Sequence, residues 1–224
     1  MLPGRYADLM TKPVLYDYWR SSASYRVRIA LHLKGIDFER VSVNLLEGEQ
    51  RSDDYRARNP QGFVPMLELG GMRLTQSLAI MDALDHHVCE PRLVPEGLAA
   101  RAHVIAMALA IACDIHPLNN LRVLEYLGDL GIEKDARGDW YRHWVADGFD
   151  ALEALAARQA GAFLYGDAPT LADICLVPQA YNARRFDIAM ERWPTLARAD
   201  ANAQKLDAFA AAHPDRVAPA AASG

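Results

Sequence analysis

Residues 66–74 read Met-Leu-Glu-Leu-Gly-Gly-Met-Arg-Leu, two short apolar runs joined by Gly70-Gly71. A glycine pair between such runs predicts a β-hairpin, because a tight hairpin turn needs positive φ angles that glycine adopts without a steric penalty. The hairpin is the clearest local signal in the chain. Other predicted elements around it are strands at 14–19 and 38–43 and helices at 24–34 and 77–88, with a short helix within the polar stretch 47–58. The predicted order is therefore β-α-β-α-β-β-α.

After about Pro95 the strand signals stop and alanine-rich amphipathic helices follow. One helix start is well marked, since Thr170-Leu-Ala-Asp173 has the spacing of a capping box. The predicted helices are 97–113, 117–130, 137–160, 170–184 and 194–212. We therefore expect an α/β domain at 13–92 and an all-helical domain at 97–217. A flexible N-terminal extension is expected at 1–12 and a flexible tail after about Val217.

The composition is that of an ordinary globular protein: 224 residues, 51% hydrophobic and 24% charged, with a formal net charge of -5. The acidic balance argues against nucleic acid as a partner, because binding phosphates requires a basic face. No run approaches 18 uncharged apolar residues, so we expect no membrane span. Proline and acid near the start replace the apolar run of a secretory signal, which predicts a cytoplasmic protein.

The three cysteines, Cys89, Cys113 and Cys175, are widely spaced and each lies among apolar residues. A buried free thiol behaves as a small hydrophobe, and we expect this for all three. None has the spacing of a zinc or dithiol site, so no metal centre is predicted.

Hydroxyl-bearing residues gather at two predicted helix starts, where free backbone amides favour an anion. Ser24 suits the cap of the first helix, which leaves Ser21 and Ser22 for another role. Gln76-Ser77 begins a later helix, where simple capping is an equally good interpretation. Between them, Val64-Pro65 before a strand suggests a cis peptide bond, although an ordinary turn would also fit.

In the second half, polar side chains cluster where Pro117 would break a helix: His116, Asn119 and Asn120. Further on, Arg184-Arg185 ends a largely apolar helix. Such a pair can complement a helix C-terminus, and arginine is also the preferred bidentate partner of a carboxylate.

Five segments together resemble the zeta class of glutathione transferases, in particular the maleylacetoacetate and maleylpyruvate isomerases. The resemblance covers about residues 13–212 and implies an α/β thioredoxin-like N-terminal domain, an all-α C-terminal domain, a homodimer and glutathione as cofactor. The segments are Arg20-Ser-Ser-Ala-Ser-Tyr-Arg-Val-Arg28, Asn59-Pro-Gln-Gly-Phe-Val-Pro65, Gln76-Ser-Leu-Ala-Ile80, Asp114-Ile-His-Pro-Leu-Asn-Asn120 and Leu171-Ala-Asp-Ile-Cys-Leu-Val-Pro-Gln179.

The resemblance also implies roles for individual residues. The catalytic set is Ser21, Ser22, Arg20 and Arg185, in which Ser21 is the expected partner of the glutathione sulfur. The glutathione-binding set is Ser21, Gln50, Val64, Pro65, Gln76, Ser77, His116 and Asn120. The residues implied to bind a small dicarboxylate substrate are Arg20, His116, Asn119 and Arg185.

The implied reaction is glutathione-dependent conversion of maleylacetoacetate to fumarylacetoacetate, a step of aromatic amino-acid catabolism. The same chemistry on maleylpyruvate, in gentisate breakdown, is an alternative that no residue separates. A general conjugating transferase and a non-catalytic glutathione-binding module are two others. Ala23 stands where many zeta enzymes have cysteine, which places reductive dehalogenation in doubt but leaves isomerisation intact.

Overall fold

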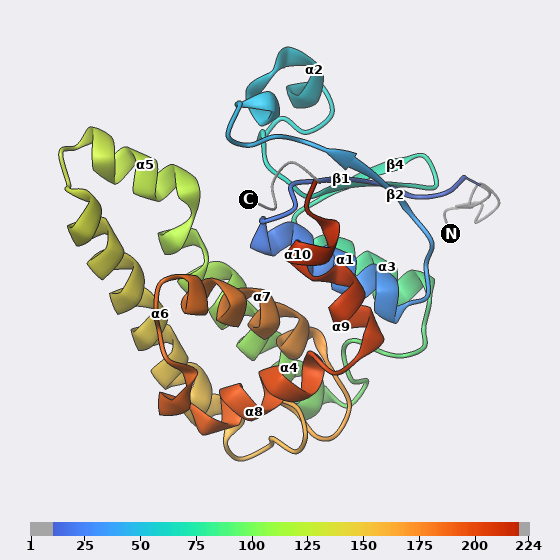
Figure 1. The fold of residues 1–224 in the computed structure, drawn as a ribbon. Coiled ribbons are helices and arrows are strands. Elements are labelled where there is room, and N and C mark those ends of the chain that lie inside the picture. Colours follow the sequence, from blue (N-terminus) through green and yellow to red (C-terminus); the bar gives the residue numbers. More distant parts are fainter. Residues whose placement is uncertain (1–10, 220–224) are drawn as a thin grey trace. The chain divides into compact units, whose positions relative to one another are not determined.

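The computed structural model describes residues 11–219, in which the chain divides into two compact units (Figure 1). The first unit contains the residues up to Pro91 and those from Asp207 onward, and the second contains Arg92–Leu206. Most of the predicted extension at 1–12, and the tail beyond 219, lie outside the described residues.

The first unit is built on a four-stranded sheet in the order β2-β1-β3-β4. Strand β1 is parallel to β2 and antiparallel to β3, and β3 forms the predicted hairpin with β4 through Gly70 and Gly71, both at positive φ. The predicted strands are therefore confirmed. Their bounds are β1 Val14–Asp17, β2 Glu39–Ser42, β3 Met66–Leu69 and β4 Met72–Thr75.

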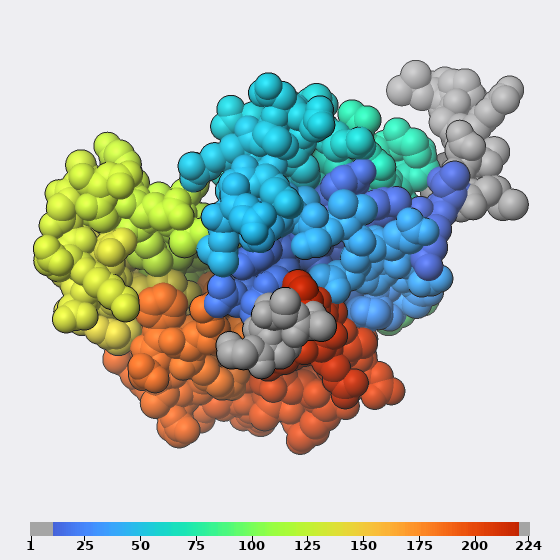
Figure 2. Space-filling view, turned by 45° about the horizontal axis from the view of Figure 1, so that its top comes forward, coloured from blue at the N-terminus to red at the C-terminus, as the bar shows by residue number. Residues whose placement is uncertain are grey.

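Helices α1 and α3 lie side by side against this sheet (Figure 1). The apolar side chains between them and the sheet, such as Leu15, Ile29 and Met66, are fully buried. The polar stretch at 47–58 precedes β3, and it forms the cyan surface at the top of Figure 2. The helices of this unit are α1 Ser22–Leu33, η2 Glu49–Arg51, α2 Asp53–Arg56, α3 Ser77–His87, α9 Asp207–Ala212 and α10 Pro214–Val217.

The predicted single helix at 194–212 is wrong. The chain forms α8 (Pro194–Ala203) and then α9, and α9 packs against α1 in the first unit. Phe209 and Ala212 are buried there, so the burial of apolar side chains favours packing of the C-terminal segment in the first unit. Residues 207–217 thus belong with the N-terminal fold, whereas the sequence placed them in a helical domain at 97–217.

The second unit is helical, with α4 Leu98–Leu109, η3 Ala110–Ile115, η4 Pro117–Asn119, α5 Leu121–Asp129, α6 Lys134–Ala156, α7 Leu171–Arg185, η5 Met190–Arg192 and α8. The predicted capping box is confirmed: the Asp173 carboxylate accepts a hydrogen bond from the Thr170 N–H at 2.8 Å. The predicted helix at 97–113 continues after Leu109 as a π-helical turn, η3.

One helical run, Leu98–Asp129, is long and apolar enough to cross a membrane, with a mean hydropathy of 1.7 over 18 residues. The core helix of a soluble protein can have the same length and hydropathy, so these two properties are weak evidence for a membrane span. Here the run is interrupted at Pro117, and α4 packs against α6 and α7.

The expectation of three buried thiols holds for Cys175 only, since Cys89 and Cys113 are exposed. Cys89 follows the end of α3, and Cys113 lies on the outer side of the π-helical turn. Each is followed by an exposed carboxylate residue, Glu90 or Asp114, so both thiols lie at the surface of the structure.

Candidate functional site

The loop between β1 and α1 places Ser21 at the start of the helix. Its Oγ accepts a hydrogen bond from the Ser24 N–H at 3.2 Å, so Ser21 is the N-cap and the predicted cap, Ser24, lies buried inside the helix. The Ser21 N–H donates to the Tyr18 carbonyl, which closes a turn and begins the helix earlier than predicted. Because the Ser21 oxygen is the acceptor in the cap, its hydroxyl proton remains for donation to an anion.

The neighbours of Ser21 differ in how they are placed. Ser22 is buried, whereas Ser21 is partly exposed at the helix start. The Arg20 guanidinium lies 4.9 Å from the centre of the Trp19 ring, a cation–π contact that leaves its charge beside the loop. Helix dipole, hydroxyl and guanidinium therefore all favour negative charge at this place.

A second loop carries the Val64-Pro65 bond, which is cis as predicted. Asn59 Nδ2 and the Tyr55 hydroxyl each donate to the Phe63 carbonyl at 2.7 Å and hold the loop from behind. Val64 packs with Tyr18 and Tyr55 in a small apolar cluster. Among the described residues, no hydrogen bond uses the backbone N–H or carbonyl of Val64. These groups can pair with the backbone of a peptide ligand.

The start of α3 is a third part of the site. Gln76 has φ 67° and ψ 116°, a conformation that is costly for a residue with a side chain and that occurs where function requires it. Gln76 occupies the cap position, but its side chain makes no capping hydrogen bond, so simple capping does not account for this residue. The Ser77 hydroxyl instead accepts from buried Arg26, Nη1 to Oγ 3.4 Å. Helix amides and a guanidinium thus favour a carboxylate here.

Gln50, on η2, faces the loop that precedes Val64. Its Nε2 donates to the Leu45 carbonyl at 3.4 Å, and its Oε1 is buried with no partner among the described residues. Gly62, at φ +64°, packs so closely that a Cβ there would lie 2.8 Å from the Gln50 carbonyl oxygen. A buried acceptor of this kind indicates a ligand that donates a hydrogen bond.

We predict that Gly62→Ala weakens glutathione binding more than it weakens the fold. The added methyl must displace the Gln50 backbone, and an alanine at positive φ also costs about 1 kcal/mol. Gly35→Ala is the matched control, because its φ of +63° carries the same strain with no atom within 4 Å of the added Cβ. Calorimetry should give a raised Kd for Gly62→Ala only, although both variants lose stability. Equal Kd values would contradict the assignment of Gln50.

In the second unit, the break at Pro117 brings the predicted polar residues together on one short segment. Asn119 is buried; its Nδ2 donates to the Ile115 carbonyl and its Oδ1 has no partner among the described residues. Asn120 caps α5, since its Oδ1 accepts from the Arg122 N–H at 3.2 Å. Ile115 fills the space at Gly148, where a Cβ would come within 2.3 Å of it, so α6 fixes the π-helical turn that carries His116.

The two arginines that end α7 have different surroundings. Arg184 forms an ion pair with the buried carboxylate of Asp200. Arg185 is exposed and, among the described residues, pairs with no carboxylate. Next to it the Phe186 ring stacks on Tyr141 with centroids 3.6 Å apart. Burial raises the Tyr141 pKa to about 12, an effect opposed by the side chains of Gln179 and Asn182 and by the charge of Arg185.

The structure places six of the eight predicted glutathione residues in the first unit, on three loops and on η2: Ser21, Gln50, Val64, Pro65, Gln76 and Ser77. The other two, His116 and Asn120, lie in the second unit. Of the predicted substrate residues, Arg20 lies in the first unit, and His116, Asn119 and Arg185 lie in the second. The predicted site omitted three residues that support it: Arg26 behind Ser77, Asn59 behind Val64, and Gln61, whose Oε1 accepts from Gln76 Nε2 at 2.8 Å. An arginine on the apolar face of a helix was the available signal for Arg26.

The sequence model of the glutathione S-transferase N-terminal domain matches residues 13–85, and that of the C-terminal domain matches 138–215. A probable maleylacetoacetate isomerase of Vibrio cholerae is 47% identical over 92% of this chain and 97% of its own. The fold is that of a glutathione transferase.

Two solved structures are also similar. A bacterial maleyl pyruvate isomerase, described as a zeta-class glutathione S-transferase, has a TM-score of 0.89 at 43% identity, covering 92% of this chain and 98% of its own. A maleylacetoacetate isomerase from Anaeromyxobacter dehalogenans, with glutathione bound in its active site, has a TM-score of 0.85 at 44% identity, covering 93% and 98%. Another structure of that isomerase carries dicarboxyethyl glutathione and citrate. The present chain belongs to the zeta class of glutathione transferases, the family of these isomerases.

Proposed function

We propose that the protein is a glutathione-dependent cis–trans isomerase that converts maleylacetoacetate to fumarylacetoacetate. The observation that carries the proposal is Arg185, which has no carboxylate partner among the described residues, beside the paired Arg184. A small dicarboxylate needs a cation that no carboxylate of the protein already neutralises. A pocket for an apolar electrophile would have no use for it.

Glutathione fits the residues of the first unit. The Val64 backbone would pair with its cysteinyl backbone, and Gln76 with Ser77 would hold its γ-glutamyl carboxylate. The buried Gln50 Oε1 would accept from one of its N–H groups. When bound, glutathione supplies a thiolate that adds reversibly to the double bond of the substrate, so that the bond can rotate.

Around the sulfur, Ser21 would donate its hydroxyl proton, and the first amides of α1 would add their partial positive charge. Both stabilise the thiolate relative to the thiol and so lower the pKa of the cofactor. Arg20, on the same loop, would meet the negative charge that develops on the substrate.

On the substrate side, Arg185 would bind one carboxylate, and His116 and Asn119 would orient the remainder. The expected role of Asn120 in glutathione binding competes with its cap on α5, because its Oδ1 already accepts from Arg122. The ligand of the relative supports the class of substrate: dicarboxyethyl glutathione is a thioether of glutathione with a unit that bears two carboxylates.

The expected result of an activity assay is turnover that needs glutathione in catalytic amounts, because the Ser21–Ser24 loop contains no thiol of its own. S-methylglutathione should inhibit, since it would occupy the same loops without a free sulfur. The control is the parallel assay on maleylpyruvate, and the substrate with the higher kcat/KM is the physiological one. Net consumption of glutathione would instead assign the protein to the conjugating transferases, and binding without turnover would make it a non-catalytic module.

A homodimer and a cytoplasmic location complete the proposal. Exposed apolar side chains such as Met72 on β4 and Leu98 on α4 are of the kind that a partner covers. Light scattering of the purified protein gives the mass in solution and decides the oligomeric state.

A further inference from the structure

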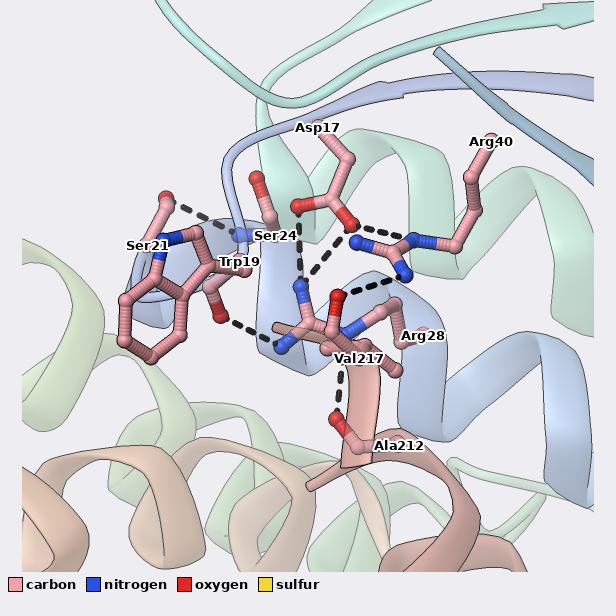
Figure 3. Close-up of polar contacts among 8 residues, drawn as sticks. All are labelled: Asp17, Trp19, Ser21, Ser24, Arg28, Arg40, Ala212 and Val217. Carbon is pink, nitrogen blue, oxygen red and sulfur yellow. Dashed lines mark hydrogen bonds and ion pairs between the residues drawn. The ribbon is translucent and has the colours of Figure 1, made fainter. Parts of the chain in front are cut away.

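Arg28, on the inner side of α1, is a charged residue with no exposed side-chain surface. Its Nη1 donates to both oxygens of the buried Asp17 carboxylate, at 2.8 and 3.0 Å. Its Nη2 donates to the Trp19 carbonyl at 3.0 Å, and its Nε donates to the Ala212 carbonyl at 3.0 Å. Figure 3 shows the guanidinium at the centre of these contacts.

The three acceptors come from different parts of the first unit. Asp17 ends β1, Trp19 lies two residues before Ser21, and Ala212 is the last residue of α9. A single planar guanidinium therefore connects the sheet, the loop before Ser21 and a helix 184 residues further along the chain. Arginine can do this because its donors point in fixed, different directions in one plane.

The loop that carries Ser21 is thereby held on both sides. Downstream, the Ser21 Oγ is bonded to the Ser24 N–H and its carbonyl to the Tyr25 N–H. Upstream, the carbonyl of Trp19 is held by Arg28 alone among the hydrogen bonds of the described residues. Arg20 and Ser21 lie between these two attachments, so the position of Arg28 determines where they stand.

We infer that Arg28 is a positioning residue for the Ser21 loop, and that α9 takes part in the glutathione site by holding Arg28 through the Ala212 carbonyl. The inference rests on the proposed place of the sulfur at Ser21. Arg40 also contacts Asp17, but it makes no contact with the loop. Its Nε donates to the Asp17 carboxylate at 2.8 Å, and its Nη1 donates to the Val217 carbonyl (Figure 3). Arg40 therefore provides a matched control.

Two pairs of full-length variants separate positioning from stability. Arg28→Lys retains a positive charge beside Asp17 but cannot reach all three acceptors, and its control, Arg40→Gln, disturbs Asp17 only.

In the second pair, Ala212→Val adds bulk at a fully buried position and moves the carbonyl away from Arg28. Ala211→Val makes the same change at the neighbouring exposed position of α9. The readout is the pKa of the thiol of bound glutathione, followed by thiolate absorbance, together with the melting temperature and the Kd of S-methylglutathione.

We expect Arg28→Lys to raise the thiol pKa by about one unit, which corresponds to a tenfold change in the ionisation equilibrium. Ala212→Val should raise it less, and the two controls should leave it unchanged even where they lower the melting temperature. The Kd of S-methylglutathione should stay within about twofold, since Val64, Gln76 and Ser77 would hold that ligand. A wild-type thiol pKa in Arg28→Lys or in Ala212→Val would show that Arg28 is only a structural tie and would overturn the inference. If the wild-type protein fails to bind S-methylglutathione, the proposed function itself falls.

Discussion

Arg185→Ala should raise the KM for the dicarboxylate at least about 30-fold, the largest effect on substrate binding that we expect of any single substitution. Removing a cation that pairs with a ligand carboxylate costs about 2 kcal/mol or more, and 1.4 kcal/mol is a factor of ten in affinity. Because the same contact holds in the ground state and in the transition state, kcat should change little. Steady-state kinetics at saturating glutathione measures both constants.

Arg184→Ala is the control for this result, since the two arginines are neighbours on one helix and only Arg184 has a carboxylate partner among the described residues. Its loss leaves the Asp200 carboxylate buried with Gln204 as remaining partner, so the variant should lose about 1–3 kcal/mol of stability but keep its KM. Arg185→Lys should recover part of the affinity, because an ammonium makes no bidentate contact. An unchanged KM in Arg185→Ala would make this arginine a helix-end residue and remove it from the site.

Ser21→Ala should lower kcat about 10- to 150-fold and raise the thiol pKa of bound glutathione. A hydrogen bond to a charged group contributes about 1.5–3 kcal/mol, which is the origin of the range. The structure adds a second consequence, because Ser21 is also the N-cap of α1 and its loss costs about 1 kcal/mol of stability. Absorbance titration of the thiolate and thermal unfolding measure the two effects independently.

Two controls isolate the contribution of the hydroxyl to catalysis. Ser52→Ala removes an N-cap of the same kind from α2, where the Oγ accepts from the Tyr55 N–H at 3.3 Å, and it should lower stability without changing the thiol pKa. Ser22→Ala tests the other serine of the loop and should reduce kcat less than Ser21→Ala, because Ser22 is buried. If Ser21→Ala leaves the thiol pKa unchanged, the helix amides alone activate the sulfur.

The local chemistry of the chain was sufficient to predict much of the fold. Gly70-Gly71 predicted the hairpin, Thr170 with Asp173 predicted the capping box, and Val64-Pro65 predicted the cis bond, because each depends on residues a few positions apart. The motifs around Ser21, Val64 and Ser77 likewise indicated the family, since the resemblance rests on short continuous segments.

Two features of the site depend on the tertiary structure: which serine caps α1, and which of the two arginines at the end of α7 is paired. The sequence alone could not tell that Ser21 rather than Ser24 caps α1, because both lie at a helix start and the choice follows from the turn that Tyr18 closes. Nor could it separate Arg184 from Arg185, since the buried partner Asp200 lies sixteen residues away.

The division of the chain was decided in the same way. From 194 to 212 the alanine-rich pattern continues with helical periodicity, so the sequence contains no mark of the break before α9. That helix joins the first unit because Phe209 and Ala212 are buried there. In addition, the Ala212 carbonyl accepts a hydrogen bond from the buried guanidinium of Arg28 on α1. A buried charge needs acceptors from wherever the chain can supply them, and only the folded chain shows that these come from its C-terminal segment.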